Sequence, residues 1–304
     1  MGPRALTKSL PKDTQVRVPR VHPLRRLSYK LHQIRKLALR GKTNRPYLSG
    51  DSFAGIADYY AFGQSGEERI NLESLRSARS IFVNGDRFDR LLHEHFSDIG
   101  AQVILTGNSD ENWDAMPTIP SAVELWLCQN SSIVDSRVST LPIGLENLRL
   151  GRSGITAHYR QHRGPRIEDK VLVPPMSDTN SVRPATVNKT QSNPALFHTM
   201  TTYMSARKYF SVARKHRFVL CLEGNGYENH RIWETLYQGN FPVMLRTPWQ
   251  QTLSYLKLPI LSVDSIHEIS LELLASFLDE NKDFSPQETP CLWIDYWEKL
   301  THGA

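Results

Sequence analysis

The sequence predicts an α/β protein with two Rossmann-like domains whose parallel sheets face a cleft. Short apolar runs alternate with segments of helical spacing, which is the pattern of parallel strands joined by helices. The alternation pauses in a polar stretch at residues 151–168 and then resumes. A chain of 304 residues is long enough to build two hydrophobic cores. We therefore expect a basic arm over residues 1–45, an N-terminal α/β domain over 46–150 and a C-terminal α/β domain over 151–304.

The basic charge of the chain is concentrated in the arm. Residues 1–45 hold 13 Lys and Arg and one acid, for +12, and the whole chain carries +6, which leaves −6 for the rest. A broad basic face for nucleic acid would have to appear in the folded body as well, so we expect no nucleic-acid partner. The sequence also has no apolar run near the ~20 residues that cross a bilayer, which argues against an integral membrane protein.

Within the arm, apolar residues recur every three or four positions from Leu24 to Ala38 between basic residues, which predicts an amphipathic helix that ends near Gly41. One interpretation is that residues 24–42 bind an anionic membrane surface. The other is a first helix that packs its leucines on the body. A mitochondrial presequence is a weaker third interpretation, because the segment is rich in Arg and poor in acids.

The predicted elements follow in chain order. In the first half we expect strands at 80–83 and 102–105, a helix at 86–96, a helix capped by Ser121 that runs through Leu127, and a segment 137–141 that leads into Pro142. In the second half we expect strands at 170–173, 217–222, 241–245 and 259–263, with helices at 195–212, 228–238 and 266–278. The aromatic residues Trp293, Tyr296 and Trp297 are expected to hold a last helix back against the body.

The three cysteines, Cys128, Cys221 and Cys291, are odd in number, far apart and placed beside apolar neighbours. This pattern fits buried free thiols in a reducing compartment better than a disulfide framework. The sequence therefore favours a cytoplasmic protein.

The richest chemical signal follows the predicted strand that ends at Glu223. The loop Gly224-Asn225-Gly226 lets backbone approach a ligand, and the helix that begins near Asn229 presents unpaired N–H groups suited to a phosphate. The loop is not a dinucleotide fingerprint, because the third glycine position holds Asn229.

On this helix Arg231, Glu234 and Thr235 share one face, while Ile232 and Leu236 point towards the sheet. Arg231 is suited to a diphosphate, and Glu234 to the hydroxyl groups of a ribose. The alternative is an intrahelical Arg–Glu pair with no ligand.

Residues 218–243 resemble the C-terminal signature of exostosin-like glycosyltransferases. Shorter segments are similar to bacterial sugar transferases of that kind: residues 105–110, 126–130, 141–146 and 177–180, followed by Arg183. The resemblance covers about residues 46–290. It implies a GT-B architecture, in which the C-terminal domain holds a nucleotide-sugar donor and the N-terminal domain meets the acceptor. A chain of 304 residues is short for that architecture, which implies a reduced N-terminal domain.

We therefore expect an enzyme that moves a sugar from a UDP- or GDP-linked donor to a glycan or lipid-linked acceptor, in surface polysaccharide synthesis at the inner membrane face. Metal-dependent sugar transferases carry Asp-x-Asp, which this sequence lacks, so we expect no metal and no other cofactor. The diphosphate would then be met by Arg231, His230, Arg183 and the helix terminus, with Arg246 as a further option.

An inverting transfer needs a base, and Asp110 and Asp51 stand at loop positions suited to one. Each has an alternative role in an Asx-turn or a helix cap, and Glu146 is a poorer candidate. The rival function is a non-catalytic protein that binds a nucleotide-sugar or a glycan and retains the site without the base. An oligonucleotide-binding protein that acts through the arm is a third option, disfavoured by the acidic body.

Overall fold

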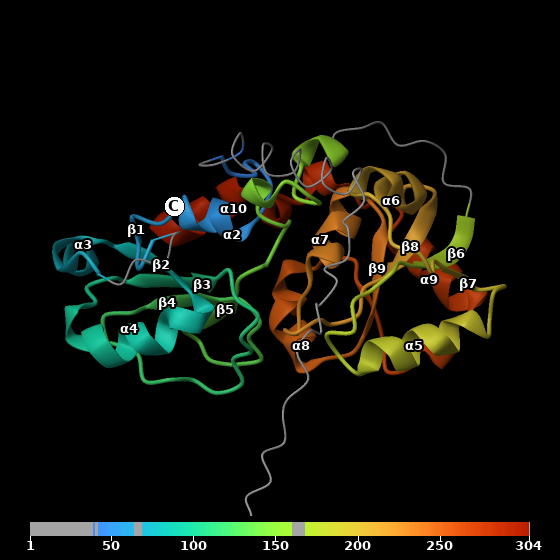
Figure 1. The fold of residues 1–304 in the computed structure, drawn as a ribbon. Coiled ribbons are helices and arrows are strands. Elements are labelled where there is room, and N and C mark those ends of the chain that lie inside the picture. The colour runs from blue at the N-terminus through green and yellow to red at the C-terminus, as the bar shows by residue number, and fades with distance from the viewer. Residues whose placement is uncertain (1–38, 40–41, 64–68, 160–167, 304) are drawn as a thin grey trace, which may run out of the picture.

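The computed structural model describes residues 39, 42–63, 69–159 and 168–303, and in them the chain forms two five-stranded sheets. Every strand pairing in both sheets is parallel. Helices cover the sheets (Figure 1). The predicted α/β class with two parallel sheets is confirmed.

The first sheet follows chain order, β1-β2-β3-β4-β5. Its strands are β1 (Tyr59–Tyr60), β2 (Ser80–Asn84), β3 (Val103–Gly107), β4 (Leu125–Cys128) and β5 (Val138–Thr140), and the helices along this part of the chain are α2 (Gly50–Ala54), α3 (Leu72–Ser77) and α4 (Phe88–His95). Successive residues of a strand point to opposite faces. Phe82 and Leu105 therefore enter one core cluster, while Ile81 and Ile104 enter another with Phe88 of α4.

The second sheet has the order β10-β9-β8-β6-β7. Its strands are β6 (Glu168–Val173), β7 (Phe197–Thr199), β8 (His216–Leu220), β9 (Phe241–Leu245) and β10 (Leu261–Val263), and its helices are α5 (Val182–Gln191), α6 (Ala206–Ala213), α7 (His230–Tyr237), α8 (Pro248–Leu253) and α9 (Leu271–Glu280). The chain first moves from β6 to β7 and then crosses to the other side of β6. The strand order thus reverses between β6 and β8, and in open parallel sheets ligands bind beyond the carboxyl ends of strands at such a point.

The two halves share one hydrophobic core. One cluster joins Leu127 and Leu141 of the first half to Trp233 and Trp249 of the second. The helices α7 and α8 lie between the two sheets (Figure 1). Residues of the two halves therefore pack against one another in a shared core.

The last helix, α10 (Ile294–His302), returns to the first half and lies beside α2 (Figure 1). Trp297 is fully buried, with its ring centroid 5.8 Å from that of Phe53. His302 Nε2 is 2.8 Å from the carbonyl oxygen of Ile56. The end of the chain thus ties the second half to the first.

Two predicted helices are wrong. The segment from Ser121 to Leu127 contains strand β4, whose consecutive residues are buried on both faces of the sheet, and this produces an apolar run that also matches helical spacing. The predicted helix 195–212 contains strand β7 as well as the shorter α6, which begins after the cap Ser205. The structure also has a helix, α5, that was not predicted, because its buried residues are Arg183, Thr186 and Thr190 and it has no apolar stripe.

All three cysteines are buried and free, as predicted. The amphipathic helix predicted at residues 24–42 lies outside the described residues except for isolated positions. Among the described helices, none is both long and apolar enough to span a membrane.

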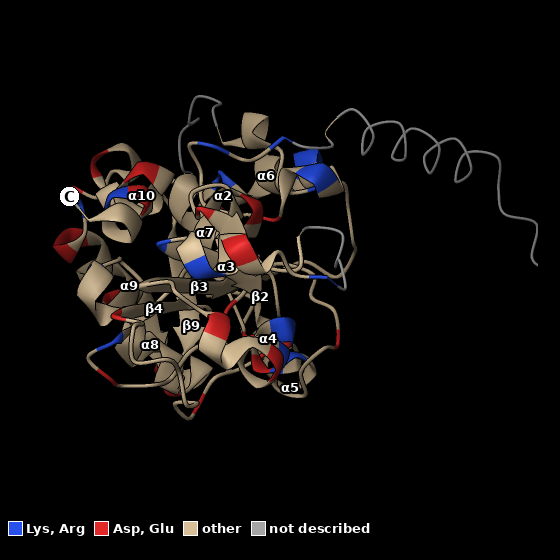
Figure 2. Cartoon of the chain, turned by 90° about the vertical axis from the view of Figure 1, so that its left-hand side faces the viewer, with Lys and Arg blue, Asp and Glu red and all other residues tan. Residues whose placement is uncertain are grey.

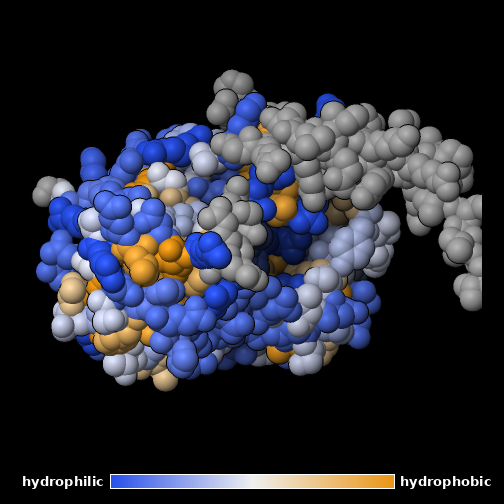
Figure 3. Space-filling model, turned by 60° about the vertical axis from the view of Figure 1, so that its left-hand side comes forward, coloured by the Kyte–Doolittle hydropathy of each residue, from blue (hydrophilic) through white to orange (hydrophobic). Residues whose placement is uncertain are grey.

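The described surface is mixed in character. Acidic and basic residues are interspersed over α3 and α4 (Figure 2). On the face shown in Figure 3, hydrophobic residues form small patches within a mainly hydrophilic surface.

Candidate functional site

Helix α7 carries the two charged residues on which the predicted site depends. It begins after Asn229, whose side-chain oxygen accepts a hydrogen bond from Arg231 N at 3.0 Å. Ile232 and Leu236 are buried in the core shared by the two halves. Arg231 and Glu234 lie on the opposite side and border a cavity. The helical spacing predicts this division of the two faces.

The cavity has a volume of about 640 Å³, and all of its lining residues lie between Gly151 and Glu234, in the second half of the chain. Arg231 and Glu234 form one wall, and the segment that joins the halves forms another. The third wall is formed by the loop between β7 and α6 together with the start of α6. The lining residues are Gly151, Arg152, Ser153, Ile155, His158, Pro175, Tyr203, Met204, Ser205, Ala206, Arg207, Tyr209, Arg231 and Glu234.

The walls are rich in arginine. Arg152, Arg207 and Arg231 border the cavity, and Glu234 contributes a carboxylate. Arg152 Nη2 is 2.7 Å from Glu146 Oε1, whereas among the described residues no carboxylate lies within 4.0 Å of the Arg207 guanidinium. The cavity thus has a surplus of positive charge and attracts anions.

Arg231 lies with Cζ 5.4 Å from the centre of the Tyr209 ring. In the described part of the chain, its buried Nε has no hydrogen-bond partner. Burial alone would lower the pKa of Arg231, but Tyr209 and Glu234 act in the other direction and the pKa is raised overall. The guanidinium therefore stays charged and retains a donor that the protein does not use.

Glu234 is buried, and its pKa is raised because burial disfavours the carboxylate. The positive charge of Arg231 opposes this shift, as does a hydrogen bond with Ser153, whereas the carboxylate of Glu146 adds to it. An unpaired buried carboxylate is costly, and Arg231 and the Ser153 hydrogen bond reduce that cost, but burial outweighs them and the pKa of Glu234 stays above its ordinary value.

The glycine loop contacts the first half of the molecule. Asn225 Nδ2 donates to Asp110 Oδ2 at 2.9 Å. A β-carbon on Gly226 would be 2.4 Å from Asn130 Nδ2. Because residue 226 has no side chain, the loop can approach Asn130 of the first half closely. None of these loop residues borders the cavity.

Arg183 donates hydrogen bonds to the segments that follow β6 and β8, the two neighbouring strands between which the strand order reverses. Its Nε donates to Glu223 O at 2.7 Å, and Nη2 donates to Leu222 O at 3.2 Å. Its Nη1 is 2.9 Å from Thr179 Oγ1 and 3.1 Å from Ser177 O. Most of its donors are therefore used within the protein. Gly224 completes this packing, because a β-carbon there would lie 3.1 Å from Arg183 Nη2.

The other predicted ligands on α7 have internal partners. His230 Nδ1 is 2.9 Å from Gly144 O, and because a carbonyl only accepts, Nδ1 carries the proton in the neutral ring. Thr235 Oγ1 donates to Arg231 O at 2.6 Å, one turn back on the same helix.

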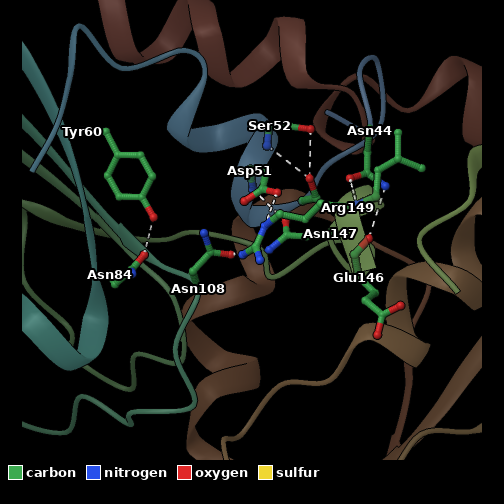
Figure 4. A network of polar contacts seen from close by, with 11 residues as sticks. Asn44, Asp51, Ser52, Tyr60, Asn84, Asn108, Glu146, Asn147 and Arg149 are labelled. Carbon is green, nitrogen blue, oxygen red and sulfur yellow. Dashed lines mark hydrogen bonds and ion pairs between the residues drawn. The ribbon is translucent and has the colours of Figure 1, made fainter. Parts of the chain in front are cut away.

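The two candidate bases lie away from the cavity. Asp51 is 5% exposed and its Oδ2 is 2.8 Å from Arg149 Nε, within a polar network at the carboxyl ends of the first strands (Figure 4). In that network Asn147 Nδ2 donates to Asn108 Oδ1 at 2.8 Å. Asp110 is exposed and bonds to Asn225. Neither aspartate borders the cavity.

Sequence reasoning missed one buried carboxyl group at the junction of the halves. Glu228 Oε1 accepts hydrogen bonds from Ile143 N at 2.8 Å and from Trp233 Nε1. Burial raises the pKa of Glu228 to about 8. Tyr203, Arg207 and Arg152 were missed for another reason, since they come from separate segments that only the folded chain brings to one cavity, and Arg207 lies in the first turn of α6.

Among the described residues, no group of three or more His, Cys, Asp or Glu side chains is arranged to hold a metal ion. The walls of the cavity instead carry guanidinium groups, which can hold an anion by themselves. Comparison with models of known protein families finds no match to the sequence, and a search of curated proteins finds none either.

Proposed function

We propose that the chain is a glycosyltransferase of the GT-B kind, which moves a sugar from a nucleotide-sugar donor to a hydroxyl group of an acceptor. The observation that carries this proposal is the arginine-lined cavity beside α7, where Arg231 offers an unused donor and Glu234 a buried carboxylate. Its position near the strand-order reversal between β6 and β8 supports the same interpretation.

The chemistry of the walls matches the parts of such a donor. The guanidinium groups of Arg231 and Arg207 suit the diphosphate, because planar arginine donors bind phosphate oxygens in pairs. The Glu234 carboxylate suits the hydroxyl groups of the ribose. A volume of about 640 Å³ falls within the range of small-molecule sites.

In this proposal the protein stabilises the departing nucleoside diphosphate by fixed positive charge. Charges aimed at the leaving group act strongly in a site that excludes water, and they need no reorganisation during the reaction. We expect the arginines to take the part that a divalent metal takes in other sugar transferases, so that chelators leave activity unchanged.

A second candidate function is a protein that binds a nucleotide-sugar without catalysis. The observation that favours it is the position of Asp51 and Asp110, which are bonded to Arg149 and Asn225 and do not border the cavity. Under this alternative the donor binds and no sugar is transferred.

The test is a panel of UDP- and GDP-sugars, with binding measured by calorimetry and turnover by release of the nucleoside diphosphate. We expect one donor to bind and to be turned over slowly with water as acceptor. Arg231→Ala should weaken its binding at least tenfold, whereas Lys215→Ala, an exposed cation outside the cavity wall, should not. Absence of binding by every nucleotide-sugar would contradict both functions, and binding without turnover would favour the second.

Replacement of Asp51 and Asp110 distinguishes the glycosyltransferase from the non-catalytic binding protein. If either acts as the base, Asp51→Asn or Asp110→Asn should lower turnover by a factor of roughly 100 or more, with the donor still bound. Urea unfolding of each variant should be measured as well, because Asp51 forms a buried ion pair and its replacement can lower stability as well as turnover.

A further inference from the structure

Tyr203 is an aromatic residue whose position folding does not explain. It lies in the loop between β7 and α6, and 68% of its surface is exposed. Tyrosine rings bury a large apolar area when a partner is available, and ligand pockets are commonly lined by aromatic side chains, so an exposed ring that borders a cavity is available to contact a ligand there. Tyr203 borders two of them.

The two hollows differ in chemistry. The larger one carries Arg207, Arg231 and Glu234. The smaller one, of about 260 Å³, lies between the end of β6 and α5. Its walls combine the apolar residues Met176, Val187 and Met200 with polar and charged residues that include Asp178 and Arg183. Tyr203 and Pro175 border both hollows and so stand at their junction.

A ligand that fits this arrangement has a flat apolar part beside an anionic part. The aromatic ring suits a planar heterocycle, because aromatic side chains stack on the faces of nucleobases, and the smaller hollow beside it offers both apolar surface and polar groups such as Asp178 and Asn188. Among the described residues Arg231 Nε has no hydrogen-bond partner and Arg207 forms no ion pair, so these guanidinium groups suit phosphate oxygens. A nucleoside diphosphate joins these two parts through a ribose, and Glu234 lies in the same cavity to accept its hydroxyl groups.

We propose that Tyr203 is the platform on which the base of the nucleoside diphosphate stacks, while the diphosphate lies against Arg207 and Arg231. This inference rests on the proposed function and adds to it the residue that recognises the base.

The test compares ligands with and without a base. Calorimetry measures the affinity of the wild-type protein for UDP, GDP and inorganic pyrophosphate, and the same three ligands are titrated into Tyr203→Ala, Tyr203→Trp and Leu271→Ala. Tryptophan keeps an aromatic face, and Leu271 is an exposed apolar residue that does not border either hollow.

We expect the wild type to bind at least one of the two nucleotides more tightly than pyrophosphate. Tyr203→Ala should weaken that nucleotide by roughly tenfold or more and change pyrophosphate binding less than twofold. Tyr203→Trp should retain the affinity, and Leu271→Ala should behave as the wild type. Because Tyr203 is exposed, its replacement should leave the unfolding midpoint in urea unchanged.

Three results would overturn the inference: an unchanged nucleotide affinity in Tyr203→Ala, an equal loss for pyrophosphate, or a wild type that binds pyrophosphate as tightly as both nucleotides. These results leave the anion site in place and are distinct from failure of the proposed function. Failure of that function would appear as a wild type that binds none of the three ligands, and it would remove this inference as well.

Discussion

The side-chain amide of Asn130 lies so close to Gly226 that a β-carbon on residue 226 would be 2.4 Å from Asn130 Nδ2. Asn130 is fully buried, and its Oδ1 accepts a hydrogen bond from Glu228 N at 2.9 Å. Asn130 follows β4 in the first half, and Gly226 belongs to the loop after β8 in the second. The absence of a side chain at residue 226 therefore allows the two halves to come together.

Gly226→Ala should lower the free energy of unfolding by about 2 kcal/mol, because the added methyl group has no room and Asn130 is held by its own hydrogen bond. Urea unfolding followed by tryptophan fluorescence measures this change. The matched control is Gly224→Ala, where the new β-carbon would meet Arg183 Nη2 at 3.1 Å and a smaller shift is needed. Equal stability of Gly226→Ala and the wild type would mean that the loop is not held against the first half.

The strands were the part of the fold most open to prediction from sequence. The runs at 80–83, 170–173 and 241–245 are short and apolar, as expected of strands covered on both faces, and each lies in a strand. The same property misled the prediction at 123–127, since an apolar run buried on both faces has no period of two. Helix α5 was missed because its inward face is made of Arg183 and two threonines.

For the site, local spacing predicted the shared face of Arg231 and Glu234, because helix geometry fixes which residues lie together. The other walls of the cavity come from residues 151–158 and 203–209, and no local pattern joins those segments to α7. The same limit applies to Arg183, whose carbonyl partners become visible only when β6 and β8 are placed side by side.

The buried carboxyl group of Glu228 should make stability fall as the pH rises. Burial raises the pKa of Glu228 to about 8 in the folded chain, from an ordinary value of 4.5. Between these values the folded chain holds a proton that the unfolded chain has released, so the contribution is complete below about pH 4.5 and is lost as the pH rises through about 8. Glu228→Gln should remove this dependence and be more stable than the wild type at pH 9, by on the order of 2 kcal/mol.

Urea unfolding at intervals between pH 5 and pH 9 measures this dependence. Glu111→Gln serves as the control, because Glu111 is an exposed carboxylate in the first half and its replacement should leave the slope unchanged. If Glu228→Gln and the wild type lose stability in parallel over this range, the buried carboxyl group is not the cause.

The hydrogen bond between His230 Nδ1 and Gly144 O predicts one tautomer of the ring. In the neutral ring Nδ1 should carry the proton and Nε2 should be unprotonated. The ¹⁵N chemical shifts of labelled histidine report this directly. His230→Asn keeps a donor near the position of Nδ1, so it should cost less stability than His230→Ala, which loses about 1 kcal/mol. A proton found on Nε2, or equal losses in the two variants, would show that this bond does not form.

Glu234 should decide whether the protein distinguishes a ribose from a deoxyribose. We expect the wild type to bind the preferred nucleoside diphosphate roughly tenfold more tightly than its 2′-deoxy form, because a hydrogen bond from a hydroxyl group to a carboxylate contributes about 1.5–3 kcal/mol. In Glu234→Gln this preference should shrink to about twofold. Calorimetry with the two nucleotides and the two proteins completes a double-mutant cycle.

The control for this cycle is Glu223→Gln. Glu223 is a carboxylate in the loop between β8 and α7, where it accepts a hydrogen bond from Asn180 at 3.1 Å, and it does not border the cavity. Its replacement should leave the preference for ribose intact. If Glu234→Gln also keeps the full preference while Arg231→Ala still weakens nucleotide binding, then the diphosphate occupies the cavity and the ribose is held by other residues. If the effects of the Glu234→Gln substitution and of the missing 2′-hydroxyl group are additive, Glu234 does not contact the ribose. Its role would then be to balance the charge of Arg231.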